Sequence, residues 1–348
     1  MAAIHKKENT KKEPGFILIS VLLMISVLAV FIIEFNYDSR IKFRLADNLN
    51  LAAEALNNAD AGIAVMMAAL RQNKDIFDDE TAQPFLSGRI QIPLDEGFCK
   101  VSIVQESGKI NINAICAPDG KPIRRRVDQM LRLIDLINDE YENNIPISYS
   151  LVPSIIDWLD FDNNVTTLPF IKGQNAGAEN YYYEKLKEPY KCKNGPFDVL
   201  NELLLVKGMT SEIFYGRKGK EKAGIKTIPG ISQYLTVYGD GKININEAPI
   251  IVIESLSESI SPSVARNIIE QRKFCRYSNI EQLKKVPGMT NGIYEEIHDL
   301  ITVDANESFY IVTSTGIIKD LERTVWVVVR KNRSTSQLNI VMRNEINI

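Results

Sequence analysis

Residues 15–33 read GFILISVLLMISVLAVFII, and no charged side chain interrupts this run before Glu34. A helix of about 20 apolar residues spans the hydrocarbon core of a bilayer, which is about 30 Å thick. Four basic residues precede the run, namely Lys6, Lys7, Lys11 and Lys12. Because Lys and Arg flanks stay on the cytoplasmic side, the pattern predicts a single-pass protein whose chain is exported after about residue 36.

The apolar run could also be the core of a cleaved signal peptide. Such a core is shorter, and a cleavage box of small residues follows it. Here the run is long and continues into Glu34-Phe35-Asn36-Tyr37 without such a box. A signal anchor or stop-transfer helix therefore fits the sequence better than a removed signal peptide.

A third interpretation rests on the residues around Gly15. The short basic leader that ends at Gly15 and is followed by Phe16 resembles a type IV prepilin leader. In that family a prepilin peptidase cleaves after the Gly and methylates the new N-terminus, which here would be Phe16. Most pilins carry Glu at the fifth mature position, whereas this chain carries Ser20.

The composition bounds the function. The chain has 348 residues, a net charge of −3, two His and four Cys. Its length is enough for two or three domains, and its charge does not favour nucleic acid as a partner. A Cys/His zinc site is not expected from so few ligands, and the sequence contains no Walker loop, HExxH, GxSxG or GxGxxG motif. We therefore expect a protein that is not an enzyme.

Helical periodicity continues beyond the membrane segment to about residue 72. Apolar residues recur there at steps of three and four: Leu45, Leu49, Ala52, Leu56, Ala59, Ile63, Met66 and Leu70. This spacing is typical of a helix that packs one face on a soluble domain. One continuous helix over 16–72 would be about 85 Å long. The alternative is a membrane helix followed by a separate linker helix, with Gly62 as the only breaker.

Two alternating runs, 98–106 and 109–116, flank Ser107-Gly108 and predict a β-hairpin. In this register Cys99 faces Cys116, at a separation of about 4.5–5.5 Å between Cβ atoms, which is near disulfide range. In an exported domain we expect that bridge to form. The alternative is two unpaired buried thiols. A second bridge, between Cys192 and Cys275, remains open.

An all-helical module is expected over 117–235, and it contains a cluster of oxygen ligands. The cluster comprises Asp157, Asp160, Asp162, Asn163 and Asn164, and Glu179 and Asn180 follow in a later loop. Such oxygen donors suit Ca²⁺, although the EF-hand pattern is missing. The alternative is that these side chains cap helices and turns.

Two segments of the chain are repeated. The sequence Gly-Lys-Ile-Asn-Ile-Asn occurs at 108–113 and at 241–246, which suggests one sheet interrupted by a helical insertion, with the chain re-entering the sheet near residue 236. Residues 197–210 and 277–290 also match, and both end in a helix-hairpin-helix turn. Such a turn either binds DNA phosphates or joins two packed helices, and no dense basic face accompanies it. The C-terminal runs 309–318, 322–330 and 338–342 predict a closing antiparallel sheet.

Taken together, the order of these motifs resembles the type II secretion system minor pseudopilin K (general secretion pathway protein K) family. The features that carry the resemblance are Gly15-Phe16, Ser20, the two Gly-Lys-Ile-Asn-Ile-Asn segments, residues 157–162 and the segment from Gly195 to Thr210. The resemblance implies an α+β fold with a pilin-like long N-terminal helix, an antiparallel sheet and a large inserted all-helical domain of the SAM-like, helix-hairpin-helix type.

The family also implies a division of the chain. The expected parts are a prepilin leader (1–15), the transmembrane part of the long helix (16–35), its periplasmic half (36–72), a first part of the pilin-like domain (73–116), the inserted helical domain (117–235), and a second part of the pilin-like domain with a helix-hairpin-helix-like segment (236–348).

As a function, the resemblance implies a minor pseudopilin at the tip of the type II secretion pseudopilus, anchored in the inner membrane with a periplasmic C-terminal domain. It would initiate assembly and help to export folded proteins. The implied partners are minor pseudopilins of the I and J types, the major pseudopilin, prepilin peptidase and the assembly platform. Calcium in the inserted domain is implied, with Asp160, Asp162 and Glu179 as candidate ligands. The alternatives are a type IV pilus minor pilin and a membrane-anchored DNA receptor.

Overall fold

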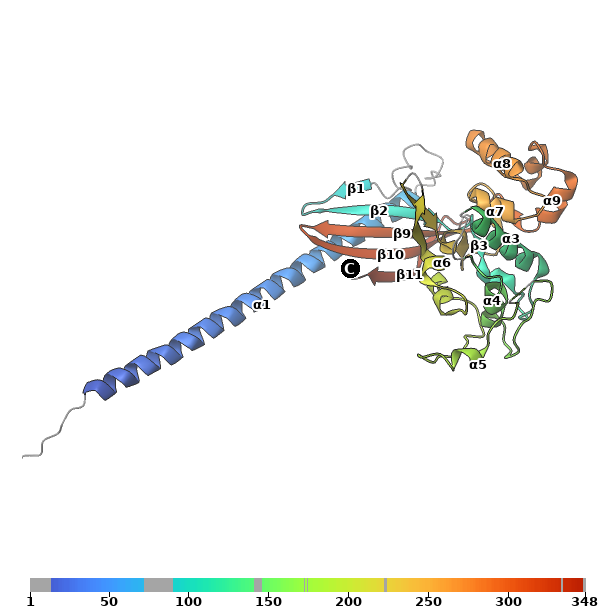
Figure 1. Ribbon diagram of the computed structural model, residues 1–348. Helices are drawn as coiled ribbons and strands as arrows, with labels where there is room; N and C mark the ends of the chain where they lie inside the picture. The colour runs from blue at the N-terminus through green and yellow to red at the C-terminus, as the bar shows by residue number, and fades with distance from the viewer. Residues whose placement is uncertain are drawn as a thin grey trace, which may run out of the picture.

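The computed structural model describes residues 14–71, 90–140, 146–171, 173, 175–221, 224–332 and 334–346. Figure 1 shows a long N-terminal helix, an antiparallel sheet packed on its second half, and a group of short helices at the far end of the sheet. The expected leader, 1–15, lies almost wholly outside the described residues, as does the start of the expected first part of the pilin-like domain, 73–116.

Helix α1 (Pro14–Arg71) is one continuous helix of 58 residues, which confirms the prediction. Every residue from Phe16 to Asn50 is exposed, and the apolar segment that starts at Phe16 is long enough to cross a membrane. Further along, α1 buries one face against the sheet, through Ala55, Ala59, Ile63, Met66 and Leu70. Gly62 does not break the helix, because its missing Cβ lets α1 approach the sheet closely: a Cβ there would lie 2.2 Å from Ser314 Oγ.

The sheet has five antiparallel strands in the order β1-β2-β9-β10-β11. Their bounds are β1 (Ile90–Pro93), β2 (Phe98–Gln105), β9 (Glu307–Ile318), β10 (Leu321–Asn332) and β11 (Leu338–Ile346). The predicted C-terminal strands are therefore confirmed. Alternate residues of β2, β9 and β10 pack with α1 into one core, which includes Val101, Ile103, Val312, Val325 and Val327.

The predicted hairpin between residues 98–106 and 109–116 is wrong. Strand β2 pairs with β9 over eight residues, from Phe98 opposite Ile317 to Gln105 opposite Tyr310. The segment after the turn forms only a two-residue strand, β3 (Ile110–Asn111), which pairs in parallel with β6 (Leu235–Thr236). The physical reason is that β9 offers β2 a long partner, whereas the Asn111 side chain accepts the Asn113 N–H and so starts a 3₁₀ turn.

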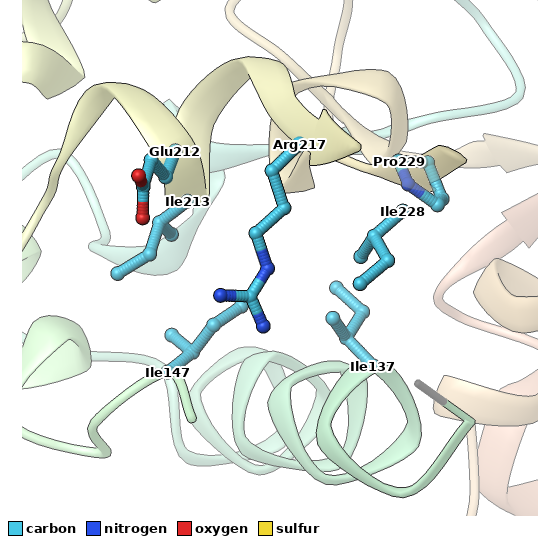
Figure 2. Close-up of a pocket in the computed structure, with 7 residues that line it drawn as sticks. All are labelled: Ile137, Ile147, Glu212, Ile213, Arg217, Ile228 and Pro229. Carbon is cyan, nitrogen blue, oxygen red and sulfur yellow. The ribbon is translucent and has the colours of Figure 1, made fainter. Parts of the chain in front are cut away.

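The first helical module begins at β3 and ends at β6. Between them lie η2 (Ile112–Ile115), α3 (Arg124–Glu140), α4 (Leu151–Leu159), α5 (Asn180–Tyr183), η3 (Leu200–Leu205), α6 (Ser211–Tyr215) and η4 (Ile231–Tyr234). A separate hairpin, β4 (Gly216–Glu221) and β5 (Gly224–Pro229), leaves the module after α6. At its base, Arg217 and Ile228 face Ile137 and Ile147 across a small cavity (Figure 2).

A second module repeats this plan in fewer residues. It contains β7 (Ile243–Asn244), α7 (Ile250–Ser255), α8 (Pro262–Phe274), η5 (Ile280–Lys285), α9 (Asn291–Ile297) and β8 (Ile301–Thr302). Strands β7 and β8 pair in parallel, as β3 and β6 do. The chain therefore returns to the sheet at Glu307 and not near residue 236, because each Gly-Lys-Ile-Asn-Ile-Asn segment opens a module of its own.

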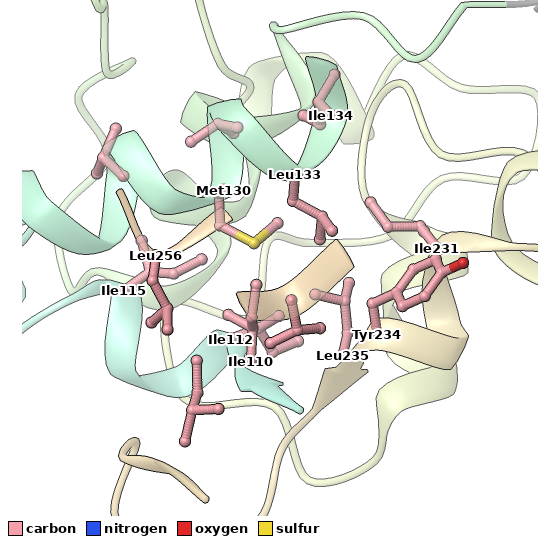
Figure 3. Packing of buried hydrophobic residues seen from close by; sticks show 14 of the residues in the cluster. Ile110, Ile112, Ile115, Met130, Leu133, Ile134, Ile231, Tyr234, Leu235 and Leu256 are labelled. Atoms are coloured by element: carbon pink, nitrogen blue, oxygen red, sulfur yellow. The ribbon is translucent and has the colours of Figure 1, made fainter. Parts of the chain in front are cut away.

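The two modules share one hydrophobic core, which is separate from the core of the sheet. Figure 3 shows residues of both contributing to it: Ile110 and Ile112 from the start of the first module, Met130 and Leu133 from α3, and Leu256 from the second module. Helix α3 also contacts α7 directly, and the Arg132 guanidinium donates to the Ser255 and Leu256 carbonyls. The modules consequently form a single body.

Candidate metal centre

The sites predicted near the N-terminus lie at the start of α1. The backbone of Gly15 is already helical, and Phe16 is exposed together with the apolar residues that follow it. The Ser20 hydroxyl donates to the Phe16 carbonyl at 2.9 Å. The fifth position after the expected cleavage point thus carries a hydroxyl that is satisfied by the helix itself.

A cluster of carboxylates lies at the end of α4. Helix α4 is buried along its whole length, and it carries Asp157 between Ile156 and Trp158 on a strongly apolar segment. Asp160 caps its C-terminal end, and Glu179 precedes α5. One carboxylate oxygen from each of Asp157, Asp160 and Glu179 can be chosen so that all three lie within 4.8 Å of one another. The fold therefore brings together three acidic side chains, of which the first and the last are 22 residues apart in the sequence.

These carboxylates are buried without enough hydrogen-bond donors. Asp157, Asp160 and Glu179 are 0%, 7% and 3% exposed. The Thr166 N–H donates to Asp157 Oδ1 at 2.8 Å. Among the described residues, however, no donor satisfies Asp157 Oδ2, Asp160 Oδ1 or either carboxylate oxygen of Glu179. A buried charge without a partner is costly, and a cation placed among these oxygen atoms would supply the missing partner.

The burial of these three carboxyl groups raises the pKa of each of them. Burial, followed by repulsion from Asp162 and Asp157, raises the pKa of Asp160 to about 6. Burial and repulsion from Asp157 and Asp160 raise the pKa of Glu179 to about 7, and burial also raises the pKa of Asp157. A divalent cation would offset both causes, since it would supply the missing opposite charge.

The structure brings together two of the three predicted ligands. Asp160 and Glu179 meet, but the Asp162 carboxylate is not part of the group: it is exposed, and its Oδ1 accepts the Asn164 N–H at 2.6 Å. Asp157 takes its place. The signal that could have identified Asp157 is its position as a single carboxylate within an otherwise apolar helix, where an acidic side chain is unexpected unless it has a buried partner.

The loop that carries Glu179 approaches α4 very closely. A Cβ on Gly177 would lie 2.2 Å from Asp157 Oδ2 and 2.5 Å from the Pro153 carbonyl. Only glycine leaves enough space for the loop at this position. Further bonds join the surrounding loops: the Asn180 side chain donates to Asn163 Oδ1 at 2.6 Å, and the Asn194 side chain donates to the Asp162 carbonyl at 2.5 Å.

The donor set fits calcium. All three side chains supply hard oxygen atoms, and Ca²⁺ binds six to eight such atoms at about 2.3–2.6 Å in flexible geometry. Within the described residues the group contains three carboxylates and no His or Cys, a ligand set that favours calcium over zinc. When bound, calcium would supply the charge that neutralises three carboxylates and would cross-link α4 with the loop before α5.

The cysteines do not form the expected bridge. Cys99 and Cys116 are both free: Cys99 is buried in the sheet opposite Gly316, and Cys116 lies beyond η2 in the first module. The pairing is wrong because it depended on the hairpin that the chain does not form. Cys192 and Cys275 are free as well, the first buried beside the Asp157 carbonyl and the second exposed after α8.

Comparisons with known proteins agree with this architecture. The family model for type II secretion system (T2SS) protein K matches residues 108–215, and a helix-hairpin-helix motif model matches residues 239–302. The chain is 24% identical over 220 residues to the type II secretion system protein K of Aeromonas hydrophila, over 59% of this chain and 62% of that relative. It therefore spans less than two thirds of that relative's length.

A solved structure has a similar fold. The chain resembles a chain of the GspK-GspI-GspJ complex from the type 2 secretion system of enterotoxigenic Escherichia coli, with a TM-score of 0.60 and 15% identity. The match covers 88% of this chain and all of the other. At this identity the likeness concerns the fold alone.

Proposed function

Because residues 108–215 form a domain of the type II secretion system protein K family, we propose that this chain is a minor pseudopilin at the tip of the pseudopilus of that system. In this role it initiates pseudopilus assembly and helps to export folded proteins across the outer membrane. Residues 16–35 anchor it in the inner membrane, and the rest of the chain lies in the periplasm.

The observation that carries the proposal is the position of the helical body. Both modules are inserted between β2 and β9, and they lie beyond the end of the sheet that is remote from the apolar part of α1 (Figure 1). In a filament whose subunits pack through their N-terminal helices, a body of this size occupies the place where a further subunit would be added above. Ser20 supports the same role, because it offers no carboxylate to pair with the N-terminus of a neighbour.

The partners follow from this position. The subunits below would contact the exposed part of α1 and the sheet, and we propose minor pseudopilins of the I and J types and the major pseudopilin in these places. GspI and GspJ are the partners in the complex that the chain resembles. Prepilin peptidase would cleave between Gly15 and Phe16, and the assembly platform would receive the processed chain.

Calcium belongs to the proposal as a structural ion. Asp157, Asp160 and Glu179 would hold it, for the reasons of burial and charge given above. The ion would stabilise the part of the first module that has no counterpart in the second, and no catalytic step depends on it.

The test of the proposed function is the mass of the mature N-terminus, measured on protein from membranes of the native host. A chain that begins at Phe16 and carries one additional methyl group is expected. A chain that still begins at Met1, in cells that process a control pilin, would overturn the assignment. Co-purification with the I- and J-type subunits separates this function from that of a type IV pilus minor pilin.

The DNA-receptor alternative is disfavoured by the first helix-hairpin-helix turn. Lys207, the basic residue of this turn, directs its ammonium group to the carbonyls of Ala176 and Gly177 rather than to solvent. Salt-dependent DNA binding that is lost on changing Lys284 or Lys285 would be needed to revive this alternative.

A further inference from the structure

Lys207 lies in the turn between η3 and α6, and its contacts all reach the segment around the metal centre. Its Nζ donates to the Gly177 carbonyl at 2.9 Å and to the Ala176 carbonyl at 3.4 Å. The same ammonium lies 5.2 Å from the centroid of the Tyr182 ring. The Lys207 N–H donates to the Tyr183 hydroxyl at 3.3 Å.

These contacts bracket Glu179 in the sequence. Ala176 and Gly177 come just before it, and Tyr182 and Tyr183 come just after it in α5. Gly177 also lies against the Asp157 side chain, since a Cβ built on it would lie 2.2 Å from Asp157 Oδ2. Lys207 therefore contacts the chain just before and just after Glu179. Among the described residues, the Glu179 carboxylate itself accepts no hydrogen bond.

The second module provides an internal comparison. The turns Val206-Lys207-Gly208-Met209-Thr210 and Val286-Pro287-Gly288-Met289-Thr290 match residue for residue except at one position. Gly208 and Gly288 both have φ near +88°, and Thr210 and Thr290 both cap the following helix through their hydroxyls. The difference is Lys207 against Pro287, and proline has no side-chain donor.

The difference coincides with the presence of the metal segment, by which we mean residues 157–179, whose first and last residues are Asp157 and Glu179. In the first module 84 residues separate the bonded pair Asn113 and Phe197, and in the second only 31 separate the equivalent pair, Asn246 and Tyr277. The additional chain in the first module includes the acidic residues and the loop before α5. The module with the metal segment has the lysine, and the module without it has proline.

We infer that Lys207 is a positioning residue for the metal centre: it holds the Ala176–Gly177 backbone and α5 so that Glu179 meets Asp157 and Asp160. This inference rests on the proposed calcium site. It assigns to the helix-hairpin-helix turn of the first module the task of fixing a loop, in place of the phosphate contact that such turns make in DNA-binding proteins.

The test is calcium titration of the full chain in detergent micelles, by calorimetry after removal of metal with a chelator. Lys207→Met keeps the length of the side chain and removes the donor. Loss of an outer partner of a metal ligand weakens affinity by about 10- to 100-fold, and we expect the Kd for calcium to rise by that factor. Lys207→Arg, which can donate to the same carbonyls, should restore most of the affinity.

A matched control is Lys285→Met, two residues before Pro287 in the second turn, which should leave the Kd unchanged. A purely structural role would lower the melting temperatures of the calcium-free and the calcium-bound protein equally and would not change the Kd. That result would overturn the inference. If Lys207→Met does not fold, Lys207→Leu, which also lacks a donor, replaces it, and a Kd equal to that of the wild type would again overturn the inference. Failure of the wild-type chain to bind calcium would instead overturn the proposed metal centre itself, and with it the positioning role of Lys207.

Discussion

Asn113 and Phe197 are joined by a reciprocal pair of hydrogen bonds that recurs between Asn246 and Tyr277. The Asn113 side chain donates to the Phe197 carbonyl at 3.0 Å and accepts the Phe197 N–H at 2.8 Å. Asn246 makes both bonds with Tyr277 at 2.9 Å. Each asparagine also donates to the residue after the closing strand, Val237 or Val303. The two clamps close the two modules in the same way.

The first prediction concerns the clamp of the second module. Asn246→Asp keeps the acceptor but removes the donor, and it leaves the Tyr277 and Val303 carbonyls unsatisfied in a buried place. We expect the free energy of unfolding to fall by about 2–6 kcal/mol, because each of the two buried unpaired carbonyls costs about 1–3 kcal/mol. Denaturant unfolding measures the loss. Asn267→Asp, which loses one bond to the Pro287 carbonyl at the surface, is the control and should cost much less.

The second prediction concerns Gly62 in the middle of α1. Helix propensity alone favours alanine over glycine by about 1 kcal/mol. We expect Gly62→Ala to destabilise the protein nevertheless, because the new Cβ would lie 2.2 Å from Ser314 Oγ and 2.8 Å from Val101 Cγ2. The melting temperature of the full chain measures the effect. At exposed Ala64, Ala64→Gly should show the ordinary propensity cost, and a stabilising Gly62→Ala would contradict the observed packing.

The third prediction concerns pH. The pKa of Asp160 is raised to about 6 and that of Glu179 to about 7 in the calcium-free fold. The folded state therefore binds more protons than the unfolded state between about pH 4 and pH 7, and the stability of the calcium-free protein falls as pH rises through this window. Calcium needs the ionised carboxylates, so the increase in melting temperature on adding calcium should grow with pH. An increase that is the same at about pH 5 and about pH 8 would contradict the ligand set.

The fourth prediction concerns the β4–β5 hairpin. The second module closes from α9 to β8 without such a hairpin, and Gly216 and Gly230 are close enough that a Cβ on Gly230 would lie 2.4 Å from the Gly216 nitrogen. Deletion of residues 217–229 should therefore leave a protein that unfolds cooperatively. Its melting temperature should fall, because Ile137 and Ile147 lose part of their cover. Loss of cooperative unfolding would show that the hairpin is needed to close the module.

The fifth prediction concerns the thiols. Cys275 is exposed, whereas Cys99 is buried in the sheet under α1, and burial raises the pKa of its thiol. Alkylation of the native protein should modify Cys275 first and Cys99 only after unfolding. Peptide mapping should then find no bridge between Cys99 and Cys116; finding one would mean that the sheet pairs differently.

The resemblance to the type II secretion system protein K family was readable from the sequence, and the family match over 108–215 confirms it. The continuous helix and the C-terminal strands were equally predictable, because each depends on periodicity within one segment. The apolar run from Gly15 to Ile33, the repeated Gly-Lys-Ile-Asn-Ile-Asn segments and the two glycine turns are all local patterns. Such patterns fix the kind of element that a segment forms.

What the sequence could not decide is which distant segments meet. Strand β2 pairs with β9, more than 200 residues away, and not with the strand that follows it. Asp157 joins Asp160 and Glu179, whereas Asp162, two residues beyond Asp160, turns to solvent. Lys207 finds its carbonyl partners about 30 residues upstream. Strand pairing and ligand geometry are properties of the packed chain, because a long partner strand or a closely approaching glycine outweighs proximity in sequence, and only the tertiary structure determines them.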